Sequence, residues 1–101
     1  MTSPIAGLSP QQSQKIISIL TGVAGIRSAI VFGSRAKGNF KPGSDIDIAV
    51  IADDLKIDDL RRIEEQYAAL YMPWKLDIVD FKRIEKKALI EHIERVGIAL
   101  F

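Results

Sequence analysis

Two aspartates lie two positions apart in the segment Asp45-Ile46-Asp47-Ile48, where acidic and apolar residues alternate. In an extended strand this spacing points both carboxylates to one face, while the isoleucines face the other way. Two carboxylates held side by side repel each other, which raises the pKa of one of them unless a cation neutralises the pair. Because hard oxygen ligands prefer Mg²⁺ or Mn²⁺ to softer metals, the pair predicts a divalent-metal site.

A third acidic residue, Asp77, interrupts the otherwise apolar run 76–79. An unpaired carboxylate is costly to bury in such a strand, so we expect Asp77 to bind the same metal as Asp45 and Asp47. Asp80, three residues further on, is the alternative third ligand. Residues three apart on a strand face opposite sides, so Asp77 and Asp80 cannot both join the cluster. We assign the role to Asp77.

Gly33 and Ser34 follow an apolar run that ends at Phe32, where a buried strand is expected to pass into a turn or a helix. Glycine lets backbone N–H groups approach a phosphate, a serine hydroxyl adds a donor, and a following helix N-terminus favours an anion. Metal ligands on one side and phosphate donors on the other predict a triphosphate site. In the alternative interpretation Ser34 is a helix cap; a nucleophilic role lacks a recognisable base and a G-x-S-x-G motif.

Hydrophobic periodicity and turn residues predict the elements that position these side chains. Ser9, Pro10 and Gln12 predict a helix start by serine capping, an N1 proline and a capping box, and Gly22 and Gly25 mark its exit. The other expected elements are a strand at 26–32, a loop at 35–44 with one helical turn at its start, a strand at 45–52, a helix capped by Asp58 or Asp59 and stopped by Pro73, a strand at 76–81, and a helix at 82–96 that includes Ile84 in its apolar face. The apolar tail 98–101 either fills the core or contacts another subunit.

We expect an α/β (α+β) fold over residues 1–101: one domain with a small mixed sheet of three or more strands and helices packed against it.

Composition sets the limits of function. The chain has 101 residues, of which 48% are hydrophobic and 27% charged, which suits one compact domain with little surface left for an elaborate cleft. The formal charge of +1 is spread evenly, so we expect no direct nucleic-acid or membrane binding. Cysteine is absent and His92 is the single histidine, which argues against a zinc site and a serine–histidine relay. We expect His92 to be at the surface or partly packed.

With no signal sequence and no run of the ~20 apolar residues that a membrane span needs, we expect a cytoplasmic protein.

The joint spacing of these motifs resembles a known family. Gly33-Ser34, ten intervening residues and Asp45-Ile46-Asp47 match the signature of the DNA polymerase beta-like nucleotidyltransferase superfamily. The segments 33–38 and 44–48 are similar in particular to its minimal nucleotidyltransferase branch, and Leu76-Asp77-Ile78-Val79 resembles the strand with the third carboxylate. The resemblance runs from the first helix to the last residue.

The resemblance implies transfer of a nucleoside monophosphate, AMP from ATP in our interpretation, to an acceptor hydroxyl. Two Mg²⁺ ions, replaceable by Mn²⁺ and about 3.5–4 Å apart, would clamp the reacting oxygens. Asp45 and Asp47 would bind both ions, and Asp77 would bind the one that activates the acceptor and help to take its proton. The residues that would contact the phosphates or nucleotide are Gly33, Ser34, Arg35, Lys37 and Ser44. For Arg35 and Lys37, solvated loop cations are the equal alternative.

The resemblance also implies a partner. Small members of the branch are often antitoxins for a HEPN-domain RNase toxin, and some adenylylate a tyrosine on it. A short chain needs a hetero-oligomeric partner or a homodimer to complete the base and acceptor walls. Three functions stay open: a transferase acting on a HEPN protein, a non-catalytic antitoxin that neutralises it by covering it, and a subunit of an aminoglycoside-type small-molecule transferase.

Overall fold

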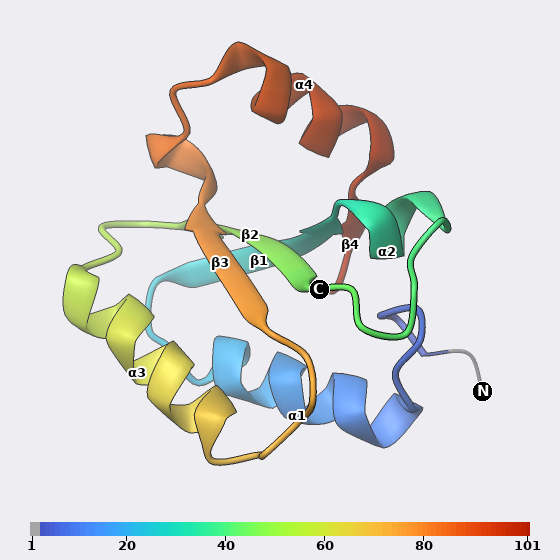
Figure 1. The fold of residues 1–101 in the computed structure, drawn as a ribbon. Helices are drawn as coiled ribbons and strands as arrows, with labels where there is room; N and C mark the ends of the chain where they lie inside the picture. Colours follow the sequence, from blue (N-terminus) through green and yellow to red (C-terminus); the bar gives the residue numbers. More distant parts are fainter. Residues whose placement is uncertain (1–2) are drawn as a thin grey trace.

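The computed structural model describes residues 3–101 as a layer of strands between helices (Figure 1). Along the chain the elements are α1 (Pro10–Thr21), β1 (Ile26–Phe32), α2 (Ser34–Lys37), β2 (Ile46–Ala52), α3 (Ile57–Ala68), β3 (Leu76–Asp80), a 3₁₀ turn η1 (Phe81–Arg83), α4 (Lys87–Val96) and β4 (Ile98–Ala99). The strands form one mixed sheet in the order β3-β2-β1-β4. The strand β1 pairs antiparallel with β2 and β4, whereas β2 and β3 run parallel. The expected α/β fold with a mixed sheet is confirmed.

Alternation along β2 separates the two faces of the sheet. Ile48 and Val50 point into a core that they share with buried residues of α1 and α3. Ala49 points the other way, into a second cluster with Phe32 of β1 and Ile93 of α4. Figure 1 shows the same division, with α1 and α3 below the strands and α4 above them. The β2 residues that alternate with Ile48 and Val50 therefore lie on the face of the sheet that α4 covers.

The helix starts follow local capping chemistry. Ser9 caps α1 as predicted: its hydroxyl accepts from the Gln12 N–H at 3.1 Å, and the Gln12 side chain accepts from the Ser9 N–H at 2.9 Å. The prediction that Asp58 or Asp59 is the N-cap of α3 is wrong, since Lys56 occupies that position. Asp59 lies in the first turn and accepts from the Lys56 N–H at 2.9 Å.

The last helix begins later than predicted. The chain leaves β3 through η1, and the residues at 84–86 are not helical before α4 begins at Lys87. The Asp80 carboxylate accepts from the Lys82 N–H at 3.2 Å and caps the 3₁₀ turn, and Ile84 has an extended backbone with ψ 123°. Ile84 still packs against the second cluster. Its apolar character therefore correctly predicted packing against the core, but the predicted helix at this position was wrong.

The apolar tail forms a short edge strand, which the sequence did not predict. Ile98 and Ala99 pair with Val31 and Ile30 of β1, and Leu100 packs against the main core. Ile98 and Phe101 remain partly exposed, so the tail both fills the core and leaves apolar surface. Within residues 3–101, no helix has the length and apolar character to cross a membrane.

Candidate transfer site at the ends of β2 and β3

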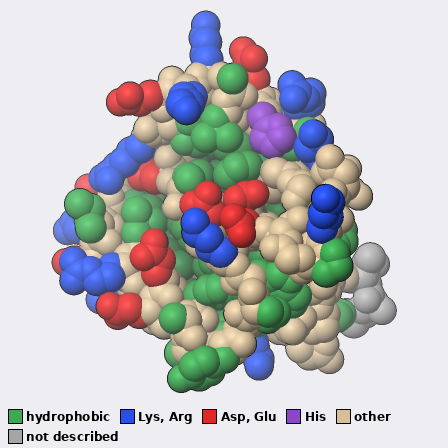
Figure 2. Space-filling model, in the orientation of Figure 1, with side chains coloured by type: hydrophobic (Ala, Val, Ile, Leu, Met, Phe, Trp, Pro, Cys, Tyr) green, Lys and Arg blue, Asp and Glu red, His purple; other side chains and the backbone are tan. Residues whose placement is uncertain are grey.

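The sheet register brings the second and third aspartates of the predicted site together. Asp47 of β2 is paired with Asp77 of the parallel strand β3, and on its other side with Phe32 of β1. Val79, two residues after Asp77, packs in the cluster under α4, which places Asp77 on the same face. Asp45 directly precedes β2, two positions before Asp47. Figure 2 shows acidic side chains gathered in the middle of this view of the molecule, with a basic side chain beside them.

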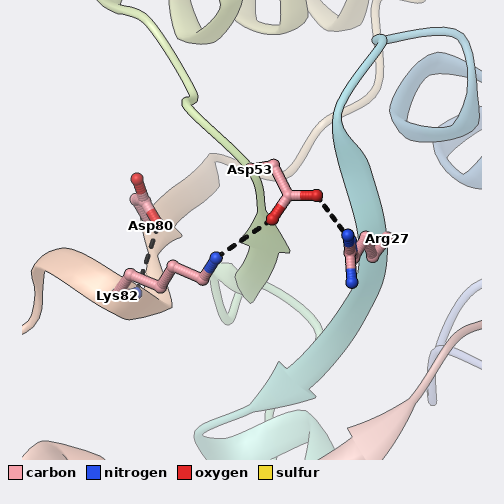
Figure 3. Close-up of polar contacts among 4 residues, drawn as sticks. All are labelled: Arg27, Asp53, Asp80 and Lys82. Carbon is pink, nitrogen blue, oxygen red and sulfur yellow. Dashed lines mark hydrogen bonds and ion pairs between the residues drawn. The ribbon is translucent and has the colours of Figure 1, made fainter.

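The electrostatics of Asp47 are those of a carboxylate among other carboxylates. Burial raises the pKa of Asp47, and the negative charges of Asp77 and Asp45 raise it further. His92 and Arg35 act in the opposite direction as the smaller influences. Asp53 provides the contrast, because hydrogen bonds from Lys82 and Arg27 lower its pKa (Figure 3). The cluster around Asp47 thus has an excess of negative charge that a divalent cation would neutralise.

The carboxylates are neighbours without converging on one point. Among residues 3–101, no three histidine or acidic side chains come close enough to enclose a metal ion. Asp45 and Asp77 are exposed, whereas Asp47 is half-buried, so the two outer carboxylates are free to rotate. The donor set fits Mg²⁺ or Mn²⁺ in type and charge, and binding an ion at all three residues requires rotation of at least one side chain.

Gly33 forms the turn that joins β1 to α2 and lies directly against Asp47. Its φ of 72° and ψ of −155° belong to a region that is essentially restricted to glycine. A Cβ at this position would overlap with the Asp47 carboxylate. The Gly33 carbonyl accepts from the N–H groups of Ala36 and Lys37, and Ser34 begins the helical turn that follows. The predicted phosphate turn and the predicted metal carboxylate are therefore in contact.

His92 also belongs to this site, which the sequence analysis did not predict. Its Nε2 accepts a hydrogen bond from the Gly33 N–H at 3.2 Å. The imidazole also meets the Phe32 ring edge to face, with the ring centroids 6.2 Å apart. The two partners are 59 residues apart in sequence, so no local pattern could reveal the contact. The Gly33 N–H that was expected to approach a phosphate is bonded to His92.

Arg35 connects the N-terminal segment to the loop that precedes β2. Its side chain is buried, at 2% exposure, and donates to the carbonyl oxygens of Ala6 at 2.8 Å and Ser44 at 2.7 Å. The guanidinium also lies over the rings of Phe40 and Trp74, at 5.1 and 5.3 Å from their centroids. Burial lowers the pKa of Arg35. The geometry gives this arginine a scaffolding role and contradicts the solvated alternative, because the side chain is buried. Its phosphate contact stays a prediction.

The remaining predicted phosphate ligands differ in availability. The Ser44 hydroxyl accepts from the Lys41 N–H at 2.8 Å, so this side chain stabilises its own loop. Lys37 is exposed at the end of α2. Their phosphate-binding roles, like those of Gly33 and Ser34, stay predictions.

Asp80 is the last residue of β3, three positions after Asp77. Its side chain accepts from the Lys82 N–H at 3.2 Å (Figure 3). The same carboxylate lies 3.5 Å from the Arg83 guanidinium. Asp80 also lines an open hollow of about 500 Å³ bordered by Leu60, Val79, Arg83, Ile84 and Leu89. This hollow lies at the opposite end of β3 from the Asp47–Asp77 pair; most of its wall surface is apolar, and Glu85 and Lys86 also line it.

Comparisons with known proteins point to one kind of enzyme. A family model described as "Polymerase beta, Nucleotidyltransferase" matches residues 14–101. A protein of Haemophilus influenzae, named "Probable protein adenylyltransferase MntA", is 38% identical over 52 residues, a match that covers 50% of this chain and 45% of that protein. The matched part thus spans less than half the length of that relative.

Solved structures agree in fold. A chain in a crystal structure of a toxin–antitoxin with AMP-PNP superposes with a TM-score of 0.72 at 28% identity, covering 87% of this chain and 71% of that one. A chain in the complex of a tri-AMPylated Shewanella oneidensis HEPN toxin with an MNT antitoxin superposes with a TM-score of 0.69 at 25% identity, covering 93% and 72%.

Proposed function

Because the chain belongs to the polymerase beta nucleotidyltransferase family, we propose that it transfers AMP from ATP to a hydroxyl group at a site formed by Asp45, Asp47 and Asp77. The observation that supports this most directly is the pairing of Asp47 with Asp77 on adjacent strands, with Gly33 packed against Asp47. The proposed metal ligands and the start of the proposed phosphate-binding turn are thereby adjacent, which supports nucleotidyl transfer.

In the proposed reaction the acceptor oxygen forms a bond to the α-phosphorus, the bond from that phosphorus to the bridging oxygen breaks, and pyrophosphate leaves. Mg²⁺, two ions in the proposal, would neutralise charge on the phosphate oxygens when bound. Asp45 and Asp47 would hold the metal beside the triphosphate, and the Ser34 hydroxyl would donate to a phosphate oxygen. Asp77 is exposed at the edge of the cluster, where it can accept the proton of the incoming hydroxyl.

The acceptor in this proposal is a hydroxyl of a HEPN-domain protein. Support comes from the AMPylated HEPN toxin in one similar complex and from the adenylyltransferase name of the Haemophilus relative. A protein acceptor also suits the shape of the site, because Asp45 and Asp77 are exposed and the hollow described above lies elsewhere. The partner, or a second copy of the chain, would then supply the missing walls around the acceptor.

The test is transfer of label from ATP. The chain is incubated with a candidate HEPN protein, Mg²⁺ and labelled ATP, and the partner is examined by mass spectrometry for added AMP. We expect addition by the wild type and none by the Asp45→Asn, Asp47→Asn double variant. Asp77→Asn should lose transfer, while Asp80→Asn, changed on the same strand outside the cluster, should keep it once corrected for folded fraction. Transfer lost equally in both single variants would contradict the assignment of Asp77.

A second candidate function is neutralisation of a HEPN partner by binding alone. The observation that favours it is the lack of three convergent acidic side chains among residues 3–101. The same experiment separates the two functions. If the wild type and the double variant neutralise the partner equally well and no label is transferred, the binding function is correct and transfer is not.

A further inference from the structure

The helix α4 covers the face of the sheet that bears the proposed site, and one of its polar side chains reaches the site. Ile93 anchors this helix in the cluster with Phe32 and Ala49. His92, the neighbouring residue, places its ring edge-on to Phe32 and its Nε2 at 3.2 Å from the Gly33 nitrogen. In this contact the Gly33 N–H is the donor and His92 Nε2 is the acceptor.

Gly33 is fixed from two sides. On one side the Asp47 carboxylate occupies the space that a Cβ of this residue would need. On the other side its N–H is held by His92. Gly33 has φ 72° and ψ −155°, a conformation open to glycine but not to residues with a Cβ. Because the glycine backbone can also adopt other conformations, these two contacts hold the turn in place. The direction of Ser34, the first residue of α2, depends on this turn.

We propose that His92 is a positioning residue for the transfer site: by accepting the Gly33 N–H, it holds the Gly33–Ser34 turn against Asp47 and so aligns the phosphate end of the site with the metal end. This inference rests on the proposed function. The imidazole acts through the turn and does not touch the reacting atoms. An apolar residue of similar size would still fill the space beside Phe32, but it would leave a half-buried N–H without an acceptor.

The distinguishing variants are His92→Gln and His92→Leu. A glutamine carbonyl on the same helix can reach the position of Nε2 and accept the Gly33 N–H, whereas leucine fills the space without accepting. Glu94→Gln, an exposed change on the same helix, is the control. Each variant is assayed for AMP transfer with separate determination of KM for ATP and kcat, for AMP-PNP binding in Mg²⁺, and for the amide NMR shifts of Gly33 and Ser34.

We expect His92→Leu to raise KM for ATP and the dissociation constant for AMP-PNP about tenfold, with kcat changed less, because the lost contact orients groups that bind the triphosphate. His92→Gln should restore both constants to within about threefold of wild type. In His92→Leu the Gly33 and Ser34 amide signals should move together, and in the control they should not.

The inference is overturned if His92→Leu binds AMP-PNP as tightly as the wild type, or if its only effect is a lower melting temperature that His92→Gln shares. A wild type that neither transfers AMP nor binds AMP-PNP refutes the proposed function, and the positioning role with it. A wild type that does both, beside an unaffected His92→Leu, refutes the positioning role alone.

Discussion

Replacement of Gly33 by alanine tests the contact between the turn and the aspartate cluster. The φ of 72° and ψ of −155° impose about 1–3 kcal/mol of strain on any residue with a Cβ. For a domain of this size that corresponds to a fall in Tm of roughly 5–20 °C. The new methyl group would also overlap with the Asp47 carboxylate. A flexible carboxylate can turn away at little cost in stability, so we expect this second effect to appear in function.

Two other glycines separate these effects. Gly38 has a φ of 90° but no atom within 4 Å of its Cβ position, so Gly38→Ala should cost about 1–2 kcal/mol without disturbing the site. Gly43 has neither a positive φ nor a close neighbour, and Gly43→Ala should change stability by less than about 0.5 kcal/mol. The assay is urea unfolding together with AMP-PNP binding and AMP transfer at a temperature where all variants are folded.

We expect Gly33→Ala to lose transfer and nucleotide binding, and both other variants to keep them. If folded Gly33→Ala binds AMP-PNP and transfers AMP as well as Gly38→Ala does, the displaced carboxylate has no role in the site and the reasoning is refuted.

The pH dependence, the buried arginine and the bound nucleotide give further predictions. Because the pKa of Asp47 is raised in the fold, the stabilising contribution of its protonated form is present below the ordinary carboxyl pKa and is lost as pH rises through the raised value. Without metal, Asp47→Asn should therefore be more stable than the wild type at pH ~7. In urea unfolding this advantage should be gone near pH ~3. Arg35→Lys should lower the free energy of unfolding by about 2 kcal/mol, because lysine cannot serve both the Ala6 and Ser44 carbonyls, and a loss below about 0.5 kcal/mol would contradict the scaffolding role. Mg²⁺ with AMP-PNP at about 100 times its dissociation constant should stabilise the wild type by about 2.7 kcal/mol in thermal unfolding, and the Asp45→Asn, Asp47→Asn double variant by almost nothing.

Local pattern was sufficient to predict much of the fold and of the acidic cluster. Alternation around Asp47 correctly indicated which β2 residues share a face, because side-chain direction in a strand depends on parity alone. The capping box at Ser9 likewise depends only on neighbours in sequence.

The features that sequence analysis missed depend on contacts between distant segments. His92 meets Gly33 across 59 residues, and Arg35 is buried because carbonyls from residues 6 and 44 surround it. The charge of Arg35 favoured a side chain that faces solvent or phosphate. In the fold the guanidinium is buried, because backbone carbonyls that no local pattern identifies offset the free-energy cost of its desolvation. The start of α4 was misplaced because Ile84 is buried from an extended segment, and burial was mistaken for helical periodicity.

The most direct test of the account is a crystal structure of the chain with Mn²⁺ and AMP-PNP, with the metal located by anomalous scattering. The account predicts Mn²⁺ bound by carboxylate oxygens of Asp45, Asp47 and Asp77, with AMP-PNP phosphates at the Gly33–Ser34 turn and the Asp45 or Asp77 side chain rotated inward. Metal bound elsewhere, or a nucleotide complex in which Asp77 does not contact the metal, would contradict it.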